Sequence, residues 1–150
     1  MQARPTTEQI LNDLAREIRD GLIPACDDPA MVPNLQMMEQ LLTAAAVRSA
    51  HEIAWMNEEG EAAVALARDV VAETGDEATA AALAAYDEGR SDSLHLDDQV
   101  ENYSLAGEAL GRAIEAADGH PHLVSRANDL IRARRDTETQ IRPGFFFPGR

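Results

Sequence analysis

A seven-residue apolar repeat near the middle of the chain most restricts what the sequence can fold into. In alternating steps of four and three residues, the repeat consists of Leu96, Val100, Tyr103, Gly107, Leu110, Ile114 and Ala117. This spacing returns a side chain to the same face of an α-helix at each turn and is typical of a helix-packing seam. We therefore expect a helix from about Leu96 to Asp118, with Gly107 and Gly111 allowing another helix to come close.

Helical periodicity also dominates the rest of the chain, and no convincing strand pattern is present. Thr6 and Gln9 have the spacing of a capping box before the first helix, and Gly60 is expected to end the second. The remaining helices are expected at about 7–22, 30 or 33–59, 61–74, 77–89 and 121–140. The fold predicted is all-α, a bundle of five or six helices, with residues 1–140 as one domain and residues 141–150 as an extended tail.

The second of these expected helices has apolar residues on most of its sides. One face carries Leu35, Met38 and Leu42, and a neighbouring face carries Met37 and Leu41. A helix with so little polar surface is either central in its fold or shared between two chains. Met37 and Leu41 are therefore candidate interface residues.

Composition excludes several classes of function. The chain has 27 acidic residues against 13 basic ones, all of them Arg, and a net charge of −14. Such a charge disfavours nucleic acids and anionic membranes as partners. The absence of Lys excludes a Schiff-base lysine or a P-loop lysine, and the single Cys26 excludes an intrachain disulfide. No metal or cofactor is expected, because His120 and His122 are best explained as part of a polar turn between helices.

One cluster on the second expected helix has the residue types of a small binding pocket. Arg48, His51 and Trp55 follow one another at three- and four-residue spacing and therefore lie on one face. They could hold an anionic or carbonyl ligand, or they could form an ordinary interface in which Arg48 pairs with an acid. In either case we expect Arg48 to be at least half buried and paired with a carboxylate, because a buried guanidinium needs such a partner.

The C-terminal segment contains all three Phe residues of the chain, Phe145, Phe146 and Phe147. Pro-Gly pairs on both sides of them prevent a helix. Three adjacent Phe side chains in water would form an adhesive patch. We therefore expect this tail to dock into an apolar groove, and we expect that groove to lie on another chain.

The first 60 residues resemble a family of small bacterial proteins that is known only as a domain of unknown function. The resemblance consists of Arg4-Pro5-Thr6, an amphipathic helix, the turn Leu22-Ile23-Pro24-Ala25 and an Ala-rich helix with an internal Arg48. Genes of that family often lie beside those for acyl-CoA dehydrogenases and aminoglycoside-phosphotransferase-like proteins. The resemblance implies an accessory role near acyl-CoA metabolism and supplies no catalytic residue.

Two functions from different classes follow from these features. The first is a non-catalytic interaction protein, either a homo-oligomer or an accessory subunit of a larger bacterial enzyme, which docks through its second helix and its aromatic tail. The second is a small-molecule-binding or enzymatic bundle that uses Arg48, His51 and Trp55. A cytoplasmic location is expected, because no signal peptide or membrane-spanning run is visible.

Overall fold

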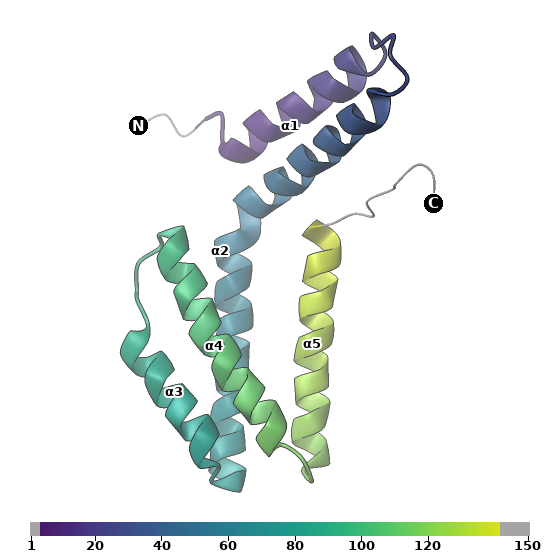
Figure 1. Cartoon of the computed structure of the whole chain (residues 1–150). Coiled ribbons are helices and arrows are strands. Elements are labelled where there is room, and N and C mark those ends of the chain that lie inside the picture. The colour runs from purple at the N-terminus through teal and green to yellow at the C-terminus, as the bar shows by residue number, and fades with distance from the viewer. Residues whose placement is uncertain (1–3, 142–150) are drawn as a thin grey trace. The chain divides into compact units, whose positions relative to one another are not determined.

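The computed structural model describes residues 4–141, and these residues fold into α-helices without a strand. The chain divides into two compact units, which are described one at a time. Of the described residues, the first contains 4–52 and 137–141, and the second is Ile53–Asp136. The sequence predicts an all-α fold, and this prediction is confirmed (Figure 1).

The first helix, α1 (Thr7–Glu17), begins at the predicted capping box. The Thr6 hydroxyl oxygen accepts a hydrogen bond from the Gln9 backbone N–H at 3.2 Å, and the Gln9 side-chain oxygen accepts one from the Thr6 N–H at 3.0 Å. The helix continues as a π-helical segment, η1 (Ile18–Leu22), in which the Ile23 N–H donates to the Ile18 carbonyl. The expected helix over residues 7–22 is thus present, and its last turn is π-helical rather than α-helical.

The second helix, α2 (Val32–Thr74), is continuous through the position where the sequence predicted a break. Gly60 is buried inside it, and a Cβ added at Gly60 would lie 3.6 Å from the Cβ of Ala106 on another helix. A glycine inside a helix costs only about 1 kcal/mol relative to alanine, an amount that tertiary packing can offset. The prediction of separate helices over 30–59 and 61–74 was therefore wrong.

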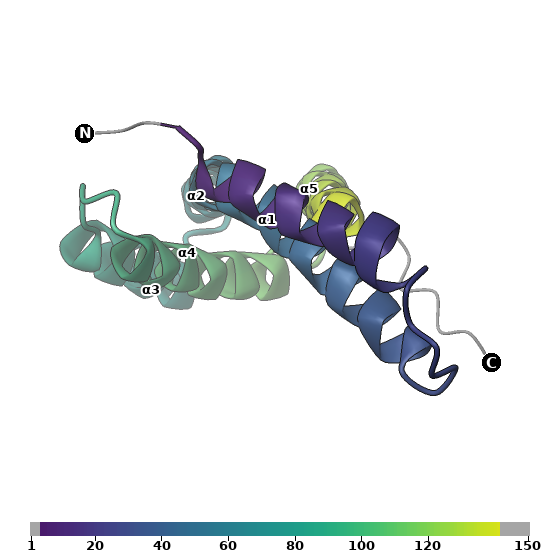
Figure 2. The same cartoon turned by 90° about the horizontal axis from the view of Figure 1, so that it is seen from above.

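The first unit is a helical hairpin, in which α1 lies beside residues 32–52 of α2 (Figures 1 and 2). An ion pair between Arg19 of η1 and Glu39 of α2 joins the two helices. The buried residues of α1, η1 and this part of α2 are Ala15, Ile18 and Ala46. Two of these three are alanines, so the hairpin removes little apolar surface from water by itself.

The second unit contains the main core. Residues 53–74 of α2 pack with α3 (Glu77–Gly89), α4 (Leu96–Ala116) and α5 (Pro121–Ile141), of which residues 121–136 belong to this unit. Figures 1 and 2 both show α3 and α4 side by side. The buried residues of the core are Val64, Leu66, Ala67, Val70, Leu83, Tyr86, Ala106, Ala109, Ala113, Ala117, Leu123 and Ala127.

The buried face of α4 differs from the predicted seam. Leu96, Val100 and Ile114 are 45%, 50% and 39% exposed, whereas the core side of the helix is formed by Gln99, Ala106, Ala109 and Ala113. Alanines on this side leave room for the neighbouring helices to approach closely. The larger residues of the heptad repeat thus lie mostly at the edge of the core or outside it, and only Ala117 of the repeat is buried.

Asp76 caps the start of α3. Its hydrogen bonds make the stability of the fold depend on pH. Its carboxylate accepts hydrogen bonds from the Thr79 N–H and the Thr79 hydroxyl, both at 2.7 Å, and these bonds lower the pKa of Asp76. A carboxyl whose pKa is lower in the folded state stabilises the fold above its unfolded pKa, near 3.9. That contribution is lost as the pH falls through the folded pKa.

We expect Asp76→Asn to keep a side-chain oxygen at the cap but to remove this titration. The free energy of unfolding of the variant, measured by urea denaturation between pH 7 and pH 2.5, should therefore fall less steeply below about pH 4 than that of the unchanged protein. Identical slopes for the two proteins would contradict the assignment.

Candidate functional site

Arg48, His51 and Trp55 of the predicted cluster on α2 are not among the lining residues of the pocket described below. Arg48 pairs with Glu52 one turn along the helix, with its Nε 3.0 Å from the carboxylate, so the expected acidic partner is present. Its side chain is 56% exposed, so the expectation that at least half of it is buried was wrong. His51 is exposed and Trp55 is half-buried. Arg48 and His51 belong to the first unit and Trp55 to the second.

The pocket lies in the second unit, beside the loop that joins α3 to α4. It has a volume of about 180 Å³. Its walls come from one side of α2, from Tyr86 of α3, from the loop and from the first two turns of α4. The lining residues are Met56, Asn57, Gly60, Glu61, Tyr86, Arg90, Ser91, Asp92, Leu94, Gln99, Asn102 and Tyr103. Neither a histidine nor a cysteine is among them, so the lining offers no such nucleophile or base.

Two amide side chains of α4 hold the loop in place. The Ser91 N–H donates to the Asn102 side-chain oxygen at 2.9 Å, and the Asn102 amide group donates back to the Ser91 carbonyl at 2.8 Å. One turn earlier, the Gln99 amide group donates to the Ser93 carbonyl. Because both amides are anchored to the same helix, the loop wall of the pocket is pre-formed.

The side-chain oxygen of Gln99 has no hydrogen-bond partner among the described residues. Gln99 is 3% exposed, and its side-chain oxygen, Oε1, accepts no hydrogen bond from any residue in the described part of the chain. A buried acceptor in this state loses its hydration without compensation, at roughly 1–3 kcal/mol. The oxygen is itself shielded from solvent, so it is a local cost to stability at the start of α4.

Both tyrosines of the chain line the pocket. The Tyr103 hydroxyl donates to a carboxylate oxygen of Glu59 at 2.7 Å, and the guanidinium carbon of Arg134 lies 5.5 Å from the centre of the Tyr103 ring. Tyr86 is 6% exposed and belongs to the main core. The aromatic part of the wall is thus held by both polar and apolar contacts.

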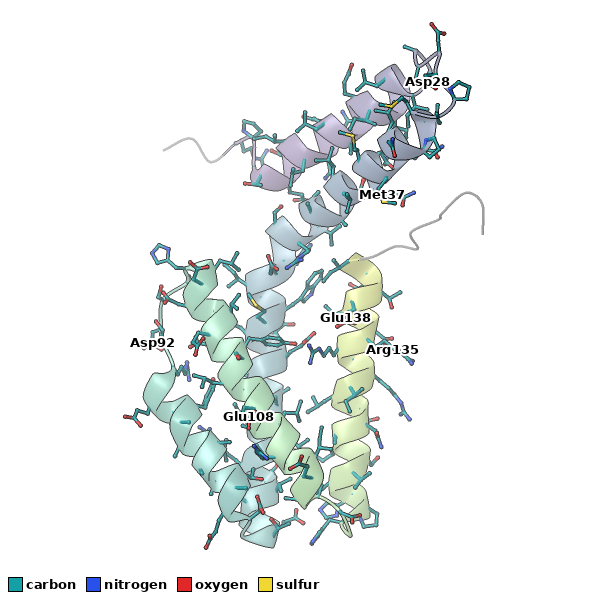
Figure 3. The ribbon with its side chains drawn as sticks, viewed as in Figure 1. Asp28, Met37, Asp92, Glu108, Arg135 and Glu138 are labelled. Carbon is teal, nitrogen blue, oxygen red and sulfur yellow. The ribbon has the colours of Figure 1, made fainter. Side chains whose placement is uncertain are left out.

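Three charged residues belong to the lining, two of them acidic. Glu61 is exposed on α2, while Arg90 and Asp92 lie on the loop, where Figure 3 labels Asp92. The Arg90 guanidinium is 3.6 Å from the Asp92 carboxylate. The Arg90 charge is therefore partly balanced within the loop, and Glu61 supplies the remaining formal charge of the lining.

The predicted interface residues are spread over both units. Met37, labelled in Figure 3, and Leu41 lie on the hairpin part of α2. Met37 is half-buried, and Leu41 is 52% exposed. Gly107 and Gly111 are exposed, and no side chain among the described residues comes within 4 Å of a Cβ added at either. No helix within residues 4–141 therefore uses them for close packing. Phe145–Phe147 lie outside the described residues.

Sequence reasoning missed the residues that build the pocket. Gln99 and Asn102 lie between members of the apolar heptad repeat, and the sequence analysis did not single them out. The available signal was the pair of amides three residues apart directly after a Ser-rich loop, because amides in such positions often bond to loop backbone. Even that signal does not reveal the wall contributed by α2.

Comparison of the chain with protein-family models, with curated proteins and with solved structures finds no match. The resemblance of the first 60 residues to a bacterial family thus stays a prediction. Within residues 4–141, no helix has the length and apolar character needed to cross a membrane. The same residues contain no group of three or more His, Cys, Asp or Glu side chains placed to hold a metal ion.

Proposed function

We propose that this protein is a non-catalytic interaction protein that assembles with a second copy of itself, or serves as an accessory subunit, through the helical hairpin of its first unit. The observation that carries the proposal is the apolar surface that the hairpin leaves in water. Large apolar side chains that are about half exposed occur on both of its helices and at its turn. They are Ile10, Leu14, Leu22, Met31, Met38 and Leu41.

A second hairpin is a suitable occupant of this surface. Two antiparallel helices have no enclosed interior, whereas two such hairpins together form a four-helix bundle with a shared core. Fully burying a Leu, Ile or Met side chain contributes about 1.5–3 kcal/mol. Half-exposed residues on both copies would therefore together supply a substantial driving force for association.

Charge also favours the hairpin over the rest of the chain as the place of self-association. Residues 4–52 contain eight acids and four Arg, a net charge of −4, whereas residues 53–136 contain 18 acids and seven Arg, a net charge of −11. Because like charges repel, two copies meet at lower electrostatic cost through the first unit.

The test is the molecular mass of the full chain in solution, measured by sedimentation equilibrium between 1 and 100 µM. We expect a reversible dimer, and we expect Leu41→Glu to shift it to a monomer without loss of helical circular dichroism, because Leu41 is not part of a buried core. The matched control is Leu96→Glu, since Leu96 is 45% exposed in the second unit. It should leave the dimer intact.

A monomer at 100 µM would rule out self-association. A dimer that survives Leu41→Glu, or that is lost equally with Leu96→Glu, would show that the hairpin is not the interface.

A further inference from the structure

We propose that the C-terminal tail of this chain, residues 142–150, docks its three Phe side chains on the start of α4 in the same molecule. The surface that it covers, here called the α4 face, consists of Leu94, Leu96, Val100 and Gly107. The inference does not depend on how the hairpin of the first unit associates. It rests on the apolar exposure of the α4 face, on its charge and on the length of chain that is available to reach it.

The α4 face is apolar and is left uncovered by residues 4–141. Leu94, on the loop before α4, is 72% exposed, more than any other large apolar side chain of the described residues. Leu96 and Val100, one turn apart on the helix, are 45% and 50% exposed. Gly107 follows on the exposed side, and no described side chain comes within 4 Å of a Cβ added there. Aromatic rings therefore have room to lie against this face.

The charge around the α4 face complements that of the tail. Residues 91–111 contain five acids and no Arg, whereas residues 142–150 contain two Arg and no acid. Asp97 and Glu101 are exposed and directly follow Leu96 and Val100 in the sequence, so carboxylates lie beside the apolar side chains. The hairpin suits the tail less well, because residues 4–52 contain four Arg among eight acids, and these Arg repel a basic segment.

The end of α5 runs along the same side of the second unit as the start of α4. The guanidinium carbon of Arg134 on α5 lies 5.5 Å from the ring centre of Tyr103 on α4. Each of these two residues is 14 positions from the turn at 117–120, as is expected of antiparallel neighbours. The direction from Tyr103 back to Val100 is therefore also the direction from Arg134 towards the C-terminal end of α5.

The chain beyond Arg134 is long enough for the Phe side chains to reach Val100. The helix α5 continues for seven residues from Arg134 to Ile141, which is about 10 Å at 1.5 Å per residue. Phe145–Phe147 follow four to six residues after Ile141, and an extended chain of that length spans roughly 13–20 Å. The tail can therefore bring these rings back to the level of Tyr103 and Val100.

Attachment to the same chain favours this tail over the tail of a second copy. A short flexible connection gives a segment an effective concentration in the millimolar range, well above that of a second copy at micromolar protein. The fixed backbone angles of Pro143 and Pro148 also reduce the entropy that the tail loses on docking. The groove is thus assigned to the tail's own chain, and not to another chain as the sequence alone favoured.

The test is the broadening of backbone amide signals in the NMR spectrum of the full chain by a spin label on the tail. The label is attached at Gly149→Cys in a chain that also carries Cys26→Ser, so that it has a single site. With the label and ¹⁵N on the same chain, we expect the amide signals of Leu96 and Val100 to lose at least half of their intensity. The signal of Ala116, at the far end of α4, should keep its intensity.

Two substitutions with a matched control locate the contact. Val100→Glu places a charge in the α4 face and should reduce the loss of the Leu96 signal at least twofold. Val124→Glu is the control, because Val124 is 40% exposed on α5 in the same unit, and it should leave the loss unchanged. Replacing all of Phe145–Phe147 by Ser should abolish the loss. Since Val100 and Val124 are both exposed, neither change endangers the fold.

A mixed sample separates docking within one chain from docking between copies. Chains with ¹⁵N but no spin label are mixed with spin-labelled chains that lack ¹⁵N, and we expect no loss of signal at Leu96 or Val100. A loss that appears equally in the mixed sample would assign the tail to a second copy and overturn the proposal.

Three further outcomes would also overturn it. Signals that keep their intensity throughout α4 would show that the tail does not dock there. Losses confined to α1 and to residues 32–52 of α2 would place the tail on the hairpin instead. Equal effects of Val100→Glu and Val124→Glu would show general attraction of a basic tail to an acidic protein.

Discussion

Replacing Leu123 by alanine is expected to lower the free energy of unfolding by about 2–5 kcal/mol. Leu123 is completely buried and belongs, with Leu66 and Val70, to the largest fully buried side chains of the described residues. It lies in the first turn of α5, so its removal leaves a cavity where that helix meets the core. The loss is to be measured by urea denaturation, followed by circular dichroism at 222 nm.

Ile131→Ala, on the same helix, is the matched control. Ile131 is 49% exposed, so its truncation should cost less than about 1 kcal/mol. Equal losses at the two positions would show that α5 does not pack on the core through Leu123.

Enlarging Ala109 to leucine is the second change with a large expected effect. Ala109 is completely buried in the middle of α4, on the side of the helix that also carries Ala106 and Ala113. Inserting three further carbon atoms into a packed interior forces neighbouring side chains or helices apart, at typically 1–3 kcal/mol. We therefore expect Ala109→Leu to lower both the free energy and the midpoint of thermal unfolding.

The same substitution at Ala85, which is exposed on α3, provides the comparison. There the larger side chain extends into solvent, and the change in stability should stay within about 0.5 kcal/mol. If Ala109→Leu is tolerated as well as Ala85→Leu, the alanine face of α4 is not in close contact with its neighbours.

The positions at which most helices begin could be predicted from the sequence, because local chemistry determines them. Thr6 and Gln9 satisfy backbone N–H groups at the start of α1, and the fixed backbone angle of Pro121 suits the first turn of α5. Such contacts join residues a few positions apart and need no tertiary structure. The all-α class follows from the same local periodicity.

The continuity of α2 and the buried side of α4 were decided by the tertiary structure. Gly60 looks like a helix end when only its neighbours in sequence are considered, but it is buried against Ala106, and the helix continues past it. The heptad repeat of α4 correctly indicates a helix. However, the alanines beside it are the residues that face the core, because the other helices approach too closely for larger side chains.

The candidate site depended on the tertiary structure throughout. Gln99 reads as a polar residue between apolar ones, and nothing nearby in the sequence shows that its amide is buried. The pocket exists because α2, the loop after α3 and the start of α4 meet around it, and these segments are up to 47 positions apart, from Met56 to Tyr103. A sequence by itself determines which segments become helices, since that depends on neighbours along the chain. Which of their faces meet, and which polar atoms are left without a partner there, depends on packing between distant segments.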